Sequence, residues 1–185
     1  MSTQLSFQNG RNERFGGEGM MGHRKSTRPL SRKHVVHVVM KSSQARGSNS
    51  LLGPRRARMV RQVLRLQSQK TGIQILETIN LGSYLHLTLR VPHRKAYTDF
   101  IRAISGLIAR KILGKERGKA GSHSSAQNKN RQSFWESRPL TQILKTDLAW
   151  SSVFRQLRER TVLAKRISAE LFQNATRDPL IHSTA

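Results

Sequence analysis

The sequence predicts an α+β protein of the ferredoxin-like βαββαβ type, in which two helices cover one face of an antiparallel sheet. Short apolar or alternating segments predict the strands, and two longer segments with helical periodicity predict the helices. Their order along the chain is strand, helix, strand, strand, helix, strand, as in the ferredoxin-like arrangement. An additional C-terminal helix and a basic N-terminal arm are expected to flank this unit.

The first strand and the first helix have the plainest patterns. The segment "VVHVVMK" is apolar on both faces, as in a strand at the centre of a sheet. The segment "PRRARMVRQVLRLQSQK" begins with Pro54, which suits a first helical turn, and Gly72 is expected to end the helix. Its apolar stripe consists of Met59, Val60, Val63 and Leu64.

A hairpin is predicted next, with its turn at Gly82 and Ser83. In "YLHLTLRV" the leucines share one face, and the other face carries Tyr84, His86, Thr88 and Arg90. With His37 of the first strand beside it, this polar face is expected to be a nucleic-acid surface or a catalytic floor. In "IQILETINL" strict alternation assigns Glu77 to the face of the isoleucines, away from the histidines.

The remaining segments complete the pattern. The helix in "RKAYTDFIRAISGLIARKILGK" has an apolar stripe of Tyr97, Phe100, Ile101, Ile104, Leu107, Ile108, Ile112 and Leu113. Phe134 and Trp135 are expected to anchor the core, and a short strand is expected after Pro139. A last helix is expected from about Asp147, with an inner face formed by Trp150, Phe154, Leu157 and Leu163.

The chain of 185 residues divides into three parts. A flexible basic arm is expected at 1–30, one domain at 31–170 and a tail at 171–185. Within the domain, a polar and basic loop is expected at 114–133.

The charge of the chain indicates its partner. It has 34 Lys and Arg against 10 Asp and Glu, a formal net charge of +24, which favours binding to a polyanion through counterion release. Nucleic acid is the leading partner, and an anionic membrane surface is its main rival. No segment is apolar enough to span a bilayer or to act as a signal peptide, so a cytoplasmic location, in the bacterial cytoplasm or nucleoid, is expected.

Cations from the arm, the first helix, the strands and the loop are expected to contact backbone phosphates. They are Arg24, Lys25, Arg28, Arg32, Lys33, Arg55, Arg56, Arg58, Arg61, Arg65, Arg90, Lys115, Arg117, Lys119, Lys129 and Arg131.

Residues suited to catalysis are few. The chain has no cysteine, which excludes disulfides, cysteine metal sites and thiol nucleophiles. His86 could approach a divalent ion together with His37, but no carboxylate is placed to complete such a site, and no cofactor is expected. Of the two tyrosines, Tyr97 lies on an apolar helical stripe and is expected in the core, while Tyr84 lies on the polar strand face.

Four ordered blocks resemble a known family. "RPLSRKHVVHVVMKSSQARGSNSLL", "GSYLHLTLRVPHRKAYTDFIRAISGLIAR", "FWESRPLTQIL" and "WSSVFRQLRERTVLAKR" are similar to the REP-associated tyrosine transposases, which are small single-tyrosine HUH transposases. The resemblance covers about residues 28–170. It implies a ferredoxin-like domain that binds hairpin-forming single-stranded DNA and cuts it through a tyrosine–phosphate bond, with a divalent ion held by a His-hydrophobic-His pair.

The resemblance fails at the residues that carry the reaction. The histidine pair of the family falls on Tyr84 and His86, so one ligand is replaced. The nucleophilic tyrosine falls on Arg160 or within a residue of it, and arginine cannot form the covalent intermediate. Tyr84, His86 and Arg160 are therefore expected to be a vestigial site.

Three functions remain open. The leading one is a catalytically inactive protein that binds hairpin or single-stranded DNA, or structured RNA. It would act as a subunit of a larger nucleoprotein complex with protein partners, and no membrane is expected. The second is an active nuclease or strand transferase that uses Tyr84 or Tyr97 and requires Mg²⁺ or Mn²⁺. The third is an RNA- or ribosome-associated structural protein.

Overall fold

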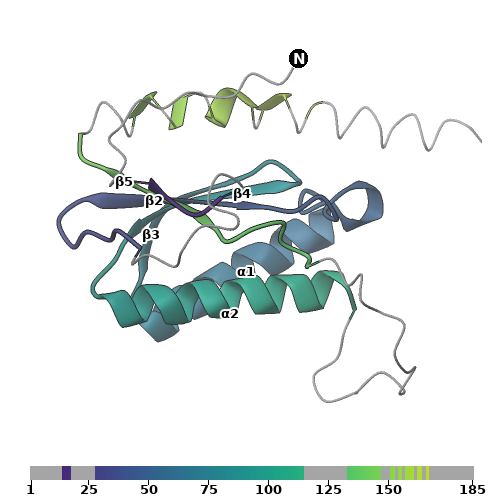
Figure 1. Ribbon diagram of the computed structural model, residues 1–185. Coiled ribbons are helices and arrows are strands. Elements are labelled where there is room, and N and C mark those ends of the chain that lie inside the picture. The colour runs from purple at the N-terminus through teal and green to yellow at the C-terminus, as the bar shows by residue number, and fades with distance from the viewer. Residues whose placement is uncertain are drawn as a thin grey trace, which may run out of the picture.

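The computed structural model describes residues 14–17, 28–114 and 133–146, together with 151, 152, 154, 155, 157–160, 162, 163 and 166. In this part of the chain, five strands form one antiparallel sheet in the order β1-β5-β2-β4-β3 (Figure 1). The strands are β1 (Arg14–Phe15), β2 (Val35–Lys41), β3 (Gln74–Asn80), β4 (Tyr84–Arg90) and β5 (Leu140–Leu144). With two helices between them, β2 to β5 have the predicted βαββαβ order.

Helices α1 (Pro54–Thr71) and α2 (Arg94–Ile112) pack side by side on one face of the sheet (Figure 1). Pro54 lies in the first turn of α1, and Gly72 ends the helix at a φ of 70°, a left-handed conformation that costs glycine little. A short 3-10 helix, η2 (Gly47–Asn49), precedes α1. No described helix is both long enough and apolar enough to cross a membrane.

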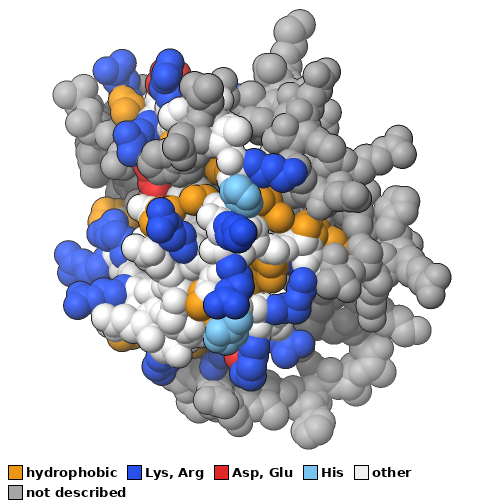
Figure 2. Space-filling view, turned by 90° about the vertical axis from the view of Figure 1, so that its left-hand side faces the viewer, with side chains coloured by type: hydrophobic (Ala, Val, Ile, Leu, Met, Phe, Trp, Pro, Cys, Tyr) orange, Lys and Arg blue, Asp and Glu red, His pale blue; other side chains and the backbone are white. Residues whose placement is uncertain are grey.

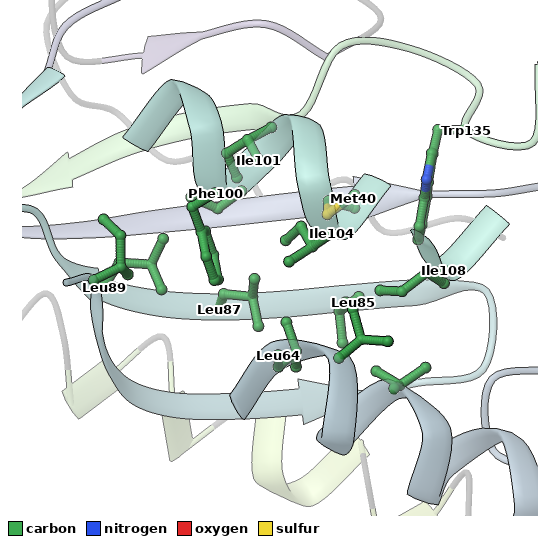
Figure 3. Close-up of a cluster of buried hydrophobic side chains, with 14 of the residues drawn as sticks. Met40, Leu64, Leu85, Leu87, Leu89, Phe100, Ile101, Ile104, Ile108 and Trp135 are labelled. Atoms are coloured by element: carbon green, nitrogen blue, oxygen red, sulfur yellow. The ribbon is translucent and has the colours of Figure 1, made fainter. Parts of the chain in front are cut away.

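The main core lies between the sheet and the two helices (Figure 3). Alternate residues of β4, namely Leu85, Leu87 and Leu89, are fully buried in it. They meet a stripe on α2 that includes Phe100, Ile104 and Ile108, as the helical spacing predicted.

Phe134 and Trp135 belong to the same core, which confirms their expected role as anchors. Their rings meet edge to face with centroids 4.9 Å apart, and the Trp135 indole donates a hydrogen bond to the Ser105 carbonyl at 3.0 Å. Both residues are buried and turned towards α2, so neither is a stacking platform for a base.

A bulge in β3 makes the expected position of Glu77 wrong. Ile75 pairs with Leu89, but Glu77 pairs with the adjacent Thr88, so Leu76 is an extra residue in the ladder. Since side chains alternate in a strand, the extra residue moves everything after it to the other face. Ile75 packs on the main core, whereas Glu77 and Ile79 lie on the face of His86.

The strand β1 was not expected from the sequence, because it falls within the segment assigned to the basic arm. It pairs with the outer edge of β5 and buries Phe15. Residues 1–13, 18–27 and 167–185, which contain the rest of the expected arm and the tail, lie outside the described residues.

The described residues after 150 are helical and lie on the sheet face opposite α1 and α2 (Figure 1). Phe154 and Leu157 are buried there against Ile79. Leu163 is 57% exposed, so its expected place on the inner face is wrong. At 3.6 residues per turn, nine residues separate Leu163 from Phe154 by about half a turn, which points the two side chains in opposite directions.

We predict that Leu87→Ala lowers the free energy of unfolding by about 3 kcal/mol, because it leaves a cavity between the sheet and both helices. Urea denaturation followed by circular dichroism measures this loss. The matched control is Leu66→Ala, since Leu66 is 45% exposed on α1 and its loss should stay within about 0.5 kcal/mol. Equal losses for the two variants would contradict the described core.

Candidate histidine site and nucleic-acid interface

A polar row crosses the second face of the sheet, beneath the C-terminal helix. The register places His37 of β2 opposite Thr88 of β4 on one side and Gln142 of β5 on the other. Thr88 in turn lies opposite Glu77 of β3. His37, Thr88 and Gln142 are each no more than 5% exposed, so this row is covered and not a free polar surface as the sequence suggested.

The two histidines of the expected site lie together, as predicted. The imidazoles of His37 and His86 stack with centroids 5.5 Å apart, and His37 Nε2 lies 3.3 Å from His86 Nδ1. One ring must donate in this hydrogen bond and the other accept. The accepting nitrogen carries no proton, so at least one of the two imidazoles is neutral. The ring of Phe154, in the C-terminal helix, meets the His37 ring edge to face with centroids 6.1 Å apart, and it covers His37.

The surroundings of His86 oppose its protonation. Burial, followed by the charges of His37 and Arg160, lowers the pKa of His86 from 6.5 to about 3. Arg160 is exposed on the C-terminal helix, yet near enough for its charge to act on the imidazole. The charge of Arg160 thus acts on His86, although 74 residues separate them along the chain.

Tyr84 lies at the open side of the histidine pair. Its ring stacks beside His86 with centroids 6.2 Å apart and is half-buried. Lys41 stands with its ammonium 5.8 Å from the centre of the Tyr84 ring and bonds Glu136 at 2.8 Å. The aromatic ring is therefore held between a cation and an imidazole, with part of its surface open to a ligand.

Glu77, the carboxylate that the bulge brings to this face, is already paired. Its Oε1 accepts a hydrogen bond from Nε of Arg158 at 2.8 Å, an ion pair that ties β3 to the C-terminal helix. Within the described ranges, no three His, Asp or Glu side chains are grouped so that they could hold a metal ion. His37 and His86 contribute two nitrogens that bond each other, which fits a metal site poorly.

Two buried atoms of the polar row have no hydrogen-bond partner among the described residues, Thr88 Oγ1 and Gln142 Nε2. Both residues flank His37. An unsatisfied buried polar group costs about 1–3 kcal/mol. Among the described residues, Thr88 Oγ1 and Gln142 Nε2 therefore lack the hydrogen bond that would offset their burial.

Tyr97 is placed on the other side of the sheet. It is 3% exposed, and its hydroxyl bonds Thr141 Oγ1 and accepts from Nη1 of Arg28, each at 2.7 Å. Burial raises the pKa of Tyr97, which disfavours the phenolate. Tyr97 is a core residue as predicted, and its position argues against the role of nucleophile.

The residues expected to contact phosphate are spread over several surfaces. Arg32, Lys33 and Arg90 are exposed at one end of the sheet, and Arg55, Arg58, Arg61 and Arg65 are exposed along α1. Arg56 donates to Asn49 at 3.3 Å, and Arg28 lies over the rings of Phe15 and Tyr97. The others lie outside the described residues: Arg24, Lys25, Lys115, Arg117, Lys119, Lys129 and Arg131.

Sequence reasoning missed three residues of this site. Phe154 is buried in an apolar cluster as predicted and in addition covers His37, while Glu77 and Arg158 join β3 to the helix above it. The (i, i+3) spacing of Phe154 and Leu157 on the predicted inner face of the last helix was the available signal. No signal in the sequence indicated the contact of Arg158 with Glu77, because this contact depends on the β3 bulge.

Comparison with solved structures found similar folds. One is a REP-associated tyrosine transposase bound to a REP hairpin, with 12% identity, a TM-score of 0.49 and coverage of 70% of this chain and 67% of that one. Another is a putative transposase from Deinococcus radiodurans, with 16% identity, a TM-score of 0.42 and coverage of 74% and 98%. No family model and no curated protein matches the chain. At TM-scores below 0.5 and identities this low, the likeness says nothing about what this chain binds or does.

We predict that acid destabilises the protein through His86. Its pKa is lowered to about 3 in the folded state, so between pH 6.5 and 3 the unfolded chain binds a proton that the folded chain does not. The stability that neutral His86 confers is complete above pH 6.5 and decreases as the pH falls, with a slope of up to about 1.4 kcal/mol per pH unit. Urea denaturation across this range measures the slope.

The variant His86→Gln removes the titrating group and should flatten this part of the profile. His34→Gln is the matched control, because His34 is exposed before β2 and outside the site. An unchanged slope in His86→Gln would show that other groups cause the acid destabilisation.

Proposed function

We propose that this chain is a transposase-related nucleic-acid-binding protein that binds hairpin or single-stranded DNA and does not cut it. The proposal joins the family resemblance of four sequence blocks, the ferredoxin-like sheet and the state of the residues at the vestigial site. The observation that carries it is the histidine pair, whose nitrogens bond each other 3.3 Å apart, with the charge of Arg160 acting on His86.

The charges around His86 support the proposal that a metal-dependent reaction has been lost. A divalent cation at His86 would stand near the positive charge of Arg160, without a carboxylate to offset the repulsion. Glu77, the acidic residue on the same sheet face, is bonded to Arg158. The residues present thus favour an anion over a metal ion beside His86.

The candidate nucleophiles lead to the same proposal. The helix that would carry the nucleophile has Arg160 near His86, and arginine cannot form a phosphotyrosine bond. Tyr97 is bonded on both sides of its hydroxyl and buried in the opposite layer. Tyr84 is the tyrosine beside His86, and it supports a second candidate, an altered nuclease, which experiment must separate from the first.

We predict tight and salt-dependent binding to a DNA hairpin. At least six phosphate contacts would weaken binding about a thousandfold between 50 and 200 mM salt, because each contact releases counterions. Fluorescence anisotropy should give a lower Kd for the hairpin than for a duplex of the stem sequence. Equal affinity for the hairpin and for unrelated duplexes would mean that the protein recognises only the charge of the nucleic acid.

An RNA hairpin of the same sequence tests the structural RNA-binding alternative. Tighter binding to RNA than to DNA at matched salt would favour an RNA- or ribosome-associated role over the proposed one.

We also predict no covalent protein–DNA product when labelled hairpin is incubated with Mg²⁺ or Mn²⁺, because the expected nucleophile is replaced. Denaturing gel electrophoresis detects such a product as a shifted band. Tyr84→Phe and Tyr97→Phe are the matched variants. A band that persists in Tyr97→Phe and disappears in Tyr84→Phe would establish the altered nuclease and overturn the proposed loss of cleavage.

A further inference from the structure

Four separate segments meet at one end of the sheet. The register places the start of β2 beside the end of β4 and the end of β5, through the pairs Val36–Leu89 and Val35–Leu144. The start of β3 joins them, since Gln74 pairs with Arg90. The connections that enter or leave these strand ends therefore form one surface, which belongs to the left-hand side of Figure 1.

This surface is basic and has no acidic residue in its four segments. Residues 28–35, 70–74, 88–98 and 144–146 contain no Asp or Glu. Their cations are Arg28, Arg32, Lys33, Lys70, Arg90, Arg94, Lys95 and Lys145. Figure 2 shows Lys and Arg side chains spread over this side of the molecule, with few acidic ones between them.

All of these cations except Arg28 are exposed, and we call four of them, Arg32, Lys33, Arg90 and Arg94, the sheet-end cluster. Nη1 of Arg94 donates to the Arg28 carbonyl at 2.9 Å, which fixes its position without neutralising its charge. Lys95 is excluded from the cluster because its ammonium bonds the Asp99 carboxylate one turn further along α2. The cluster thus combines charges from β4, α2 and the segment before β2.

In the protein without a ligand, the position of the Arg94 charge is electrostatically unfavourable. Arg94 and Lys95 occupy the first turn of α2, which has no acidic residue, and cations are disfavoured at a helix N-terminus. The neighbouring charges of the cluster repel Arg94 as well. A polyanion bound at this end would replace these repulsions by attractions.

We propose that the sheet-end cluster docks the sugar-phosphate backbone of a DNA hairpin stem. This inference rests on the proposed DNA binding. It assigns that binding to a surface other than the sheet face that carries His37 and His86. Arginine and lysine side chains on a rigid sheet end suit contacts to phosphates, which position a duplex without reading its sequence. Arg94 is a contact that the sequence did not indicate.

The chemistry of the surface favours a nucleic-acid stem over a membrane. Binding in a bilayer interface requires apolar side chains beside the cations. The exposed large apolar residues of the described chain are Leu66, Val162 and Leu163, and none lies in the four segments. Charge without apolar anchors fits a backbone of regularly spaced phosphates.

The test is the triple variant Arg32→Gln/Lys33→Gln/Arg90→Gln. Arg94 is retained because it bonds the Arg28 carbonyl. Loss of three phosphate contacts should raise the Kd for a DNA hairpin at 150 mM salt at least about tenfold and reduce the slope of log K against log salt by about 3. Anisotropy titrations at several salt concentrations measure both.

The matched control is Arg102→Gln/Arg110→Gln/Lys111→Gln, which removes the same charge from the length and the C-terminal end of α2. Its Kd should rise less than about threefold. Equal losses in the two triple variants would overturn the assignment to the sheet end. Lys33→Glu, in the segment before β2, is a second variant, and thermal unfolding checks that each protein is folded.

The outcomes separate this inference from the proposed function. Wild-type binding to the hairpin with no loss in the sheet-end variant refutes the inference and leaves the proposed function standing. No wild-type binding to DNA refutes both. A loss confined to RNA hairpins, or to vesicles of anionic lipid, would show that the surface serves another partner and would also refute the inference.

Discussion

The alternation of β4 is the constraint on which the rest of the structure depends. This strand pairs with β2 on one side and β3 on the other, so its backbone hydrogen bonds fix its orientation along its length. Leu85, Leu87 and Leu89 are buried beneath the helices, and their burial is the main reason for the register. The same alternation forces Tyr84, His86 and Thr88 to the other face, where they form the candidate site.

The C-terminal helix then decides the character of that site. It covers the polar row with Phe154 and Leu157 and is tied to β3 by the ion pair of Arg158 with Glu77. Partly exposed ion pairs contribute little, about 0–1 kcal/mol. The helix packs on the sheet through a small apolar contact, and its Arg160 adds to the burial and the His37 charge that together lower the pKa of His86.

The distribution of the scarce acidic residues matters as much as the total charge. Glu77, Glu136 and Asp99 are each bonded to a cation, at the histidine face, at β2 and on α2. The end of the sheet where the four segments meet has no such residue among them. The positive charge of these segments is therefore not offset by an acidic residue within them, and a polyanion can approach it.

The sequence by itself determined the element order, the two apolar helical stripes and the strand face that carries His86, because these follow from local periodicity. Through the family resemblance it also predicted that Arg160 and His86 belong to one site, and the charge of Arg160 does act on His86. Only the tertiary structure decided that Glu77 shares the face of His86, since one extra residue in β3 reverses the alternation without changing the apolar pattern. The cover over His37 and the meeting of Arg32, Arg90 and Arg94 were likewise decided in three dimensions, because strand pairing joins segments far apart in the chain.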